Sequence, residues 1–263
     1  MLPAWLPLLL VSPIVGSFLG VLVMRLPEGR PVALARSACD GCGTPLGVRD
    51  LVPLLSFVVL RGRCRYCCAP IDRLHPAMEL AAALVAGIVI LVEGVRASPP
   101  GLVPDGSTAW LWSGCVLGWG ALALALIDWR CLRLPDVLTL PLLLLGLAAC
   151  SVLAPDALGG HAAAVVVGYG AFCGLAWTYR RLRGRDGLGA GDAKLLAAGG
   201  AWLGLGALPV LVLCAALATL GLAVLQGRGR IDPAMPIPFG PGLAVAVWGL
   251  WLWSAPLPVA IFG

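Results

Sequence analysis

The sequence is dominated by long apolar runs that contain no Asp, Glu, Lys or Arg. These runs are Leu2–Met24, Gly106–Ile127, Val137–Pro155, Ala157–Tyr179, Leu195–Gly227 and Pro233–Gly263. Another apolar stretch lies between Glu79 and Glu93. About 20 apolar residues are enough for one helix to cross a bilayer. With 60% hydrophobic and 12% charged residues, the chain has too few polar side chains to cover a globule in water. The sequence therefore predicts an all-α polytopic membrane protein.

The number of crossings depends on the run Leu195–Gly227, whose 33 residues would make a single helix of roughly 50 Å. Gly204, Gly206 and Pro209 interrupt this run, which predicts two short helices joined by a tight turn. The total is then about eight transmembrane helices. With this number, 17 of the 18 Lys and Arg residues fall in alternate loops, and only Arg96 lies on the other side. Because basic loops normally face the cytoplasm, both termini are expected outside.

The chain is predicted to have three parts. Residues 1–24 form the first transmembrane helix, which is expected to be retained because no clear cleavage site follows it. Residues 25–76 form a cytoplasmic loop, and residues 77–263 form a transmembrane core.

Four cysteines in the loop form two Cys-x-x-Cys pairs, Cys39 with Cys42 and Cys64 with Cys67. This spacing is typical of a tetrahedral zinc site, and a site closed by four cysteines is structural and not catalytic. A disulfide is the alternative, but the loop is expected on the reducing side of the membrane. Cys68 directly follows Cys67 and could replace it as a ligand, so the sequence leaves the fourth ligand open.

Three aspartates lie at the ends of predicted spans, where ionisable groups are costly and suggest function. Asp128 ends the third span, Asp136 starts the fourth, and Asp192 starts the sixth. Because the third and sixth spans run in opposite directions, Asp128 and Asp192 are expected at the same interface. Two neighbouring carboxylates can share a proton and act as base and acid. Asp136 and Asp192 could also be simple helix caps, but Asp128 lies at a helix C-terminus, which disfavours a negative charge.

Two glycines, Gly189 and Gly191, precede Asp192. They are expected to let a substrate backbone approach Asp192.

Three functions are compatible with the aspartates and the cysteine loop. Paired carboxylates fit a protease, but intramembrane carboxylates are also typical of proton-coupled transporters. In a third interpretation, the protein is a non-enzymatic assembly scaffold in which the zinc loop is the working part.

Several motifs follow one another along nearly the whole chain. They are Gly16–Pro27, Asp50–Ser56 and Leu60–Cys64 between or beside the cysteine pairs, Ile127–Arg130 with Leu134–Asp136, Gly189–Lys194, and Pro238–Pro241. Together they resemble the type IV prepilin peptidase family, which are membrane aspartic proteases of the GxGD type.

This resemblance implies a role for individual residues. Asp128 and Asp192 correspond to the catalytic pair, and Asp136 and Lys194 correspond to motif positions with supporting roles. Glu79 also matches a family position, although a helix-cap carboxylate is an equally simple explanation.

The resemblance also implies an activity and partners. The family removes the basic leader from prepilins and pseudopilins, after a Gly and before a hydrophobic helix, at the cytoplasmic face of the bacterial inner membrane. The expected partners are these substrates and lipid, and no nucleic acid. Many members then methylate the new N-terminus with S-adenosylmethionine. The family usually has Asn at the position of Gly20, in a region linked to methylation, and the pair Gly16 and Gly20 is also typical of a close helix-packing face.

Overall fold

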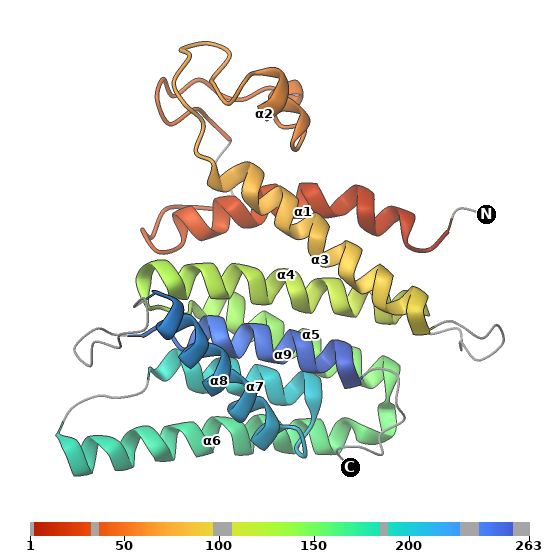
Figure 1. Ribbon diagram of the computed structural model, residues 1–263, viewed down its shortest axis with the longest axis vertical. Coiled ribbons are helices and arrows are strands. Elements are labelled where there is room, and N and C mark those ends of the chain that lie inside the picture. Colours follow the sequence, from red (N-terminus) through yellow and green to blue (C-terminus); the bar gives the residue numbers. More distant parts are fainter. Residues whose placement is uncertain (1–2, 33–36, 97–106, 185–188, 227–236, 255–263) are drawn as a thin grey trace. The chain divides into compact units, whose positions relative to one another are not determined.

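The computed structural model describes residues 3–32, 37–96, 107–184, 189–226 and 237–254 (Figure 1). These residues form helices and no β-strand, apart from two isolated antiparallel bridges. The prediction of an all-helical protein is therefore confirmed. The chain divides into two compact units, Met1–Leu102 and Val103–Gly263, and each is described by itself.

The first unit is built on two long helices, α1 (Leu6–Arg25) and α3 (Leu74–Arg96), which pack against each other. The contact is closest at Gly16, where a Cβ atom would lie 2.5 Å from the carbonyl oxygen of Met78 and 2.6 Å from the Cα of Glu79. Only glycine allows two helix backbones to approach so closely, as the Gly16 and Gly20 spacing predicts.

The segment between α1 and α3 carries the four cysteines, the 3₁₀ turn η1 (Val48–Asp50) and the short helix α2 (Leu55–Val59). In the structure, α3 belongs to the same compact unit as α1, because the glycine face of α1 gives it a packing partner.

The second unit carries the remaining described helices. They are α4 (Ser107–Cys131), α5 (Asp136–Leu153), the 3₁₀ turn η2 (Pro155–Ala157), α6 (Leu158–Arg183), α7 (Ala190–Leu203), α8 (Leu208–Gln226) and α9 (Gly240–Ser254). The central one is α7, which packs against α5, α6 and α9. Every residue from Leu195 to Leu203 is buried. Small residues make this possible, since a Cβ atom at Gly200 would lie 2.8 Å from the carbonyl oxygen of Ala164 on α6.

The long apolar run after Lys194 is broken where the sequence predicts. α7 ends at Leu203, Gly204 follows with a φ of 82°, and α8 begins at Leu208. This left-handed conformation is easy for glycine and costly for residues with a side chain. The turn lets α8 leave the direction of α7 and pack against α9.

Six helices in the described ranges are long and apolar enough to cross a membrane. They are Leu6–Arg25, Leu74–Val95, Thr108–Cys131, Asp136–Leu153, Pro155–Arg183 and Leu208–Gln226. The other two helices that correspond to predicted spans are shorter, with 14 residues in α7 and 15 in α9. Parts of the last predicted span, residues 233–236 and 255–263, lie outside the described residues, as do Arg185, Arg228 and Arg230.

The helix ends that carry the predicted site lie at one end of the second unit. α4 ends there, and α5, α7 and α9 begin there (Figure 1). The first N–H groups of a helix have no partner within the helix, so this end of the unit is rich in hydrogen-bond donors and favours negative charge.

Candidate active site and metal centre

Asp128 lies in the last turn of α4 and is buried, with 5% of the residue exposed. Its Oδ2 accepts a hydrogen bond of 2.9 Å from the backbone N–H of Gly240, the first residue of α9. The C-terminal end of α4 disfavours a negative charge, whereas the N-terminal end of α9 favours one. The position of Asp128 is therefore explained by a second helix that begins beside it.

Asp192 is the third residue of α7, whose N-cap residue is Gly189. The backbone N–H of Asp192 donates to the carbonyl oxygen of Gly189 at 3.1 Å, which closes the first turn of the helix. The structure thus places two aspartates that are 64 residues apart in the sequence at the same end of the second unit (Figure 1). Two neighbouring carboxylates can share one proton and act as base and acid.

Asp136 and Lys194, the two predicted supporting residues, form an ion pair. The Nζ of Lys194 donates to the Oδ1 of Asp136 at 2.5 Å. Asp136 is the first residue of α5, and Lys194 lies on α7 just after Asp192, so the pair ties the starts of these two helices together. Because the side chains are 30% and 54% exposed, we expect a contribution to stability of only about 0–1 kcal/mol. The main effect of this ion pair is to hold the start of α5 beside the start of α7.

The two glycines before Asp192 have different surroundings. A Cβ atom at Gly191 would lie 2.8 Å from the Cβ of Leu134, in the turn between α4 and α5. Gly191 therefore serves the packing of α7 on that turn and is not open to a substrate. Gly189 is exposed, and a Cβ atom there would lie 3.1 Å from the Oδ2 of Asp192.

Glu79 belongs to the first unit and is buried on α3, with 7% of the residue exposed. Its Oε2 accepts a hydrogen bond of 2.7 Å from the backbone N–H of Leu54, the residue before α2. Leu54 has a φ of 58°, which is unusual for a residue with a side chain. Glu79 therefore anchors the start of α2, and this contact differs from the cap of its own helix that the sequence analysis considered.

The four predicted metal ligands converge in the first unit. The Sγ atoms of Cys39, Cys42, Cys64 and Cys67 all lie within 4.8 Å of one another. The Sγ atoms of Cys39 and Cys67 are 3.7 Å apart. A tetrahedron with metal–sulfur bonds of about 2.3 Å has edges of about 3.8 Å, so the cluster has the size of a four-thiolate metal site. These cysteines are free and form no disulfide.

The two cysteine pairs lie in turns of the same design, and this similarity explains Cys68. In each turn a backbone N–H lies 3.4 Å from the first sulfur, Gly41 on Cys39 and Tyr66 on Cys64. The residue after each pair has a positive φ, 70° at Gly43 and 59° at Cys68. Cys68 therefore takes the place that glycine has in the first turn. It is exposed and is not one of the four converging cysteines.

Hydrogen bonds around the cysteine turns favour the charged forms of two side chains. Hydrogen bonds between Cys42 and the side chain and backbone of Thr44 lower the pKa of Cys42 to about 6. The thiolate is the form that binds a metal. Arg65 donates to the Oδ1 of Asp50 at 2.7 Å and holds the pKa of that carboxyl below its usual value. This ion pair fixes the second cysteine turn to η1 and is lost when acid protonates Asp50.

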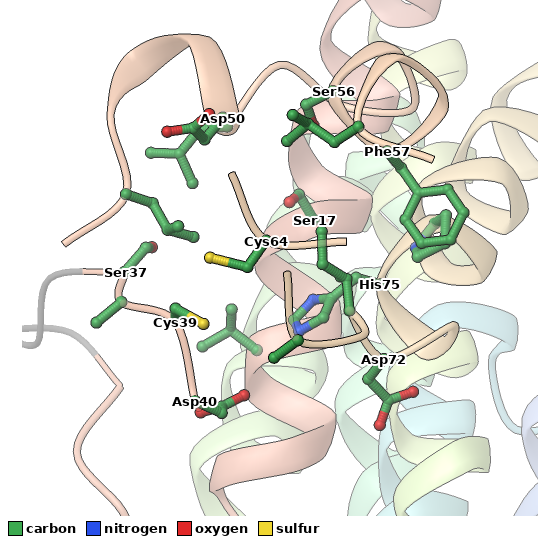
Figure 2. Close-up of a pocket in the computed structure, with 18 of the residues that line it drawn as sticks. Ser17, Ser37, Cys39, Asp40, Asp50, Ser56, Phe57, Cys64, Asp72 and His75 are labelled. Carbon is green, nitrogen blue, oxygen red and sulfur yellow. The ribbon is translucent and has the colours of Figure 1, made fainter. Parts of the chain in front are cut away.

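A cavity of about 180 Å³ lies between the inner part of α1, the start of α3 and the cysteine segment (Figure 2). Its walls carry the hydroxyl groups of Ser17 and Ser56, the imidazole of His75 and the carboxylate of Asp72 (Figure 2). The polar groups give this cavity the character of a ligand site, whereas most of the surrounding helix surface is apolar.

Sequence reasoning found the carboxylates and cysteines but did not assign a role to Gly240. The motif Pro238–Pro241 was noted only as part of a family pattern. No signal within the sequence connects Gly240 with Asp128, because the two residues are 112 positions apart.

Comparison with known proteins gives matches in both units. The profile of the bacterial peptidase A24 N-terminal domain matches residues 10–92, and that of the type IV leader peptidase family matches residues 115–224. No solved structure gives a significant match.

The curated relatives cover most of the chain. A prepilin leader peptidase/N-methyltransferase of Aeromonas hydrophila is 37% identical over 93% of this chain and 89% of its own length. A protein of the same name from Pseudomonas aeruginosa is 36% identical over 94% and 89%, respectively. A third, from Dickeya chrysanthemi, is 39% identical over 92% and 89%. On this evidence, the chain belongs to the type IV leader peptidase family, with a bacterial peptidase A24 N-terminal domain.

Proposed function

We propose that this chain is a membrane aspartic endopeptidase that removes the basic leader from type IV prepilins or pseudopilins. The observation that supports the proposal is that Asp128, in the last turn of α4, and Asp192, in the first turn of α7, lie at the same end of the second unit (Figure 1). The names of the curated relatives point to the same activity.

In the proposed reaction, a water molecule lies between the two carboxyl groups. One carboxylate takes a proton from this water as it attacks the carbonyl carbon of the scissile Gly, and the other carboxyl gives its proton to the carbonyl oxygen. The tetrahedral intermediate then collapses, the C–N bond breaks, and the leaving amine takes up a proton. No covalent bond to the enzyme forms.

We assign a structural role to the four cysteines and propose zinc as their metal. A set of four thiolates with no open position favours zinc and leaves no site for a substrate or a reactive water. Cys39, Cys42, Cys64 and Cys67 would hold the ion and join the two cysteine turns into one folded segment between α1 and α3.

N-methylation of the new N-terminus is a second candidate activity, because the curated relatives carry N-methyltransferase in their names. The cavity beside the cysteine segment is the candidate place for S-adenosylmethionine, because its carboxylates and hydroxyl groups suit a cationic sulfonium and an amino group. Gly20 leaves the nearby face of α1 without a polar side chain, and a Cβ atom there would lie 3.3 Å from the Nδ1 of His75.

We place the protein in the bacterial inner membrane, with the cysteine segment and the two aspartates at the cytoplasmic face. The support is the distribution of basic residues, since all Lys and Arg residues except Arg96 belong to loops on the same predicted side. The basic leader of a prepilin and this end of the second unit would then be on the same side of the membrane.

The test is cleavage of a synthetic prepilin by the full chain reconstituted in lipid vesicles. We expect the wild-type protein to release the leader, which mass spectrometry detects. Asp128→Asn and Asp192→Asn should each lower the cleavage rate by at least about 10²-fold, because each removes a proton-transferring group. Asp156→Asn is the matched control, because Asp156 is an exposed carboxylate on η2.

Wild-type cleavage rates in either aspartate variant would contradict the assignment of the catalytic pair. If the wild-type chain releases no leader, the peptidase proposal itself is wrong. Proton-coupled uptake into the same vesicles that needs both aspartates would instead indicate a transporter. Absence of both cleavage and uptake in the wild-type chain would favour a scaffold.

A further inference from the structure

We propose that Gly240 is a positioning residue of the active site, because its backbone N–H holds the carboxylate of Asp128 in place. The inference rests on the proposed function, since it assigns a role in the same reaction. Gly240 lies beyond the part of the chain that the type IV leader peptidase profile matches, which ends at residue 224. The inference therefore adds α9 to the elements that build the catalytic centre.

The contact between Gly240 and Asp128 is a buried hydrogen bond from the backbone of α9 to a side chain of α4. Gly240 and Asp128 are both buried, and the N–H···Oδ2 distance is 2.9 Å. A carboxylate with only 5% of its residue exposed needs a hydrogen-bond donor from the protein. The next residue on α9 is Pro241, which has no N–H to offer. Gly240 is thus the donor through which the start of α9 acts on Asp128.

Glycine is required at position 240 for space. A Cβ atom there would lie 2.6 Å from the Oδ2, 2.8 Å from the Cγ and 3.0 Å from the Cβ of Asp128. Favourable contacts between heavy atoms are about 3.5–4.0 Å, so alanine at this position would collide with the carboxylate. The φ of Gly240 is not positive, so the backbone conformation itself would accept an alanine.

The packing around α9 determines whether a collision at position 240 would move the helix or the carboxylate of Asp128. α9 packs against α4, α7 and α8. The ring of Trp251 on α9 is stacked on that of Trp110 on α4, with centroids 5.2 Å apart. Because these contacts hold α9 in place, we expect an added methyl group at position 240 to displace the carboxylate of Asp128 and break its hydrogen bond.

This displacement should affect the reaction step and leave substrate binding unchanged. A misplacement of about 1 Å in a catalytic group can cost about 10²-fold in rate. For Gly240→Ala in the full chain in vesicles, we therefore expect kcat to fall by about 10²-fold with KM within about twofold of the wild type.

Two other glycines of α9 provide matched controls. Gly249 is exposed with no atom within 4 Å of an added Cβ, so Gly249→Ala should leave both constants unchanged. At Gly242 a Cβ atom would collide with Thr219 and lie 2.7 Å from the carbonyl oxygen of Ala215, both on α8. Gly242→Ala should therefore lower the thermal midpoint while kcat per folded molecule stays near the wild-type value.

A thermal double-mutant cycle tests the contact without relying on peptidase activity. Asp128→Ala removes the Oδ2 and Cγ atoms that the new methyl group would meet. Gly240→Ala should lower Tm in the wild-type background and lower it by less than half as much in the Asp128→Ala background. If Gly240→Ala alone fails to fold, folding of the double variant is the expected result.

The outcomes separate this inference from the proposed function. An unchanged kcat, or an equal fall in Tm in both backgrounds, overturns the role of Gly240. An equal failure to fold of the single and double variants overturns it as well. If the wild-type chain does not cleave prepilin, the proposed function fails, and the double-mutant cycle alone then decides whether Gly240 holds Asp128.

Discussion

Asp128 shows at the scale of one residue how a side chain in an unfavourable position is stabilised by a distant part of the chain. Its own helix presents carbonyl groups and a negative dipole end, which disfavour a carboxylate. The N–H of Gly240 and the beginning of α9 compensate for this. Asp192 lies at the beginning of its own helix, so the sequence already places it favourably.

Sequence alone could nominate the aspartates and cysteines because their residue types carry the chemistry. It could not decide between Cys67 and Cys68, since adjacent positions have the same local spacing to Cys64. The structure distinguishes them, because Cys68 has a positive φ and its Sγ is not among the four that converge. It likewise assigns Gly191 to packing against Leu134.

Replacing Cys68 by glycine tests this distinction. A positive φ costs a residue with a side chain about 1–2 kcal/mol, and glycine adopts it freely. We therefore expect Cys68→Gly to keep the bound metal and to raise the free energy of unfolding of the cysteine segment by up to about 1 kcal/mol. Metal content measured by mass spectrometry and resistance to denaturant check both parts.

Cys67→Ser is the contrasting variant, because it removes one of the four converging sulfur atoms. It should lower metal content strongly. Equal metal loss in Cys68→Gly and Cys67→Ser would mean that Cys68 is also a ligand.

At the scale of helices, small residues decide which pairs pack closely. Gly16 brings α1 onto α3, and the Gly and Ala residues of α7 allow its burial among α5, α6 and α9. The sequence predicted helices with good accuracy because apolar length alone identifies a membrane-crossing helix. It could not show that α7 is enclosed by other helices, because apolar residues face lipid and protein equally well.

The α1–α3 contact can be tested by adding one methyl group. In Gly16→Ala, the new Cβ atom would meet the carbonyl oxygen of Met78 at 2.5 Å, so the helices must separate. Overpacking of this kind costs about 1–3 kcal/mol. Loss of helical circular dichroism during SDS titration in mixed micelles should therefore occur at a lower SDS fraction than in the wild type.

Gly87→Ala is the control on α3, because no atom lies within 4 Å of an added Cβ there. It should be neutral or stabilise the helix by up to about 1 kcal/mol, since alanine favours helices over glycine. If both variants unfold at the same SDS fraction, α1 and α3 do not depend on this close contact.

At the scale of the whole molecule, two compact units separate two kinds of chemistry. The four converging cysteines lie in Met1–Leu102, and the two aspartates lie in Val103–Gly263. The two matched family profiles follow the same division. A change in the metal centre should therefore act first on the unit that contains it.

Metal removal tests this division. We expect about one zinc ion per purified chain, and its removal by a chelator leaves four sulfur ligands without their shared partner. The cysteine segment should then lose order, and trypsin should cut faster at Arg49, Arg61 and Arg63, which are exposed. Fragments from the second unit should appear at an unchanged rate.

Added zinc should restore the protection against trypsin. Unchanged cutting at these arginines in protein shown to be metal-free would mean that the ion does not hold the cysteine segment together. Faster cutting in the second unit as well would mean that the metal stabilises the whole chain.

The sequence by itself determined that most of this chain belongs in a membrane, the approximate number of helices and the break after Leu203. It also determined the residue types of the cysteine cluster and of the aspartate pair. These are local properties, since apolar length, turn-forming glycines and Cys-x-x-Cys spacing act over a few residues. Only the tertiary structure decided which helix lies enclosed at the centre, which four sulfur atoms meet, and that Gly240 contacts Asp128. These contacts join residues far apart in the chain, and they depend on how closely helices can approach, which is set by the side chains on both partners.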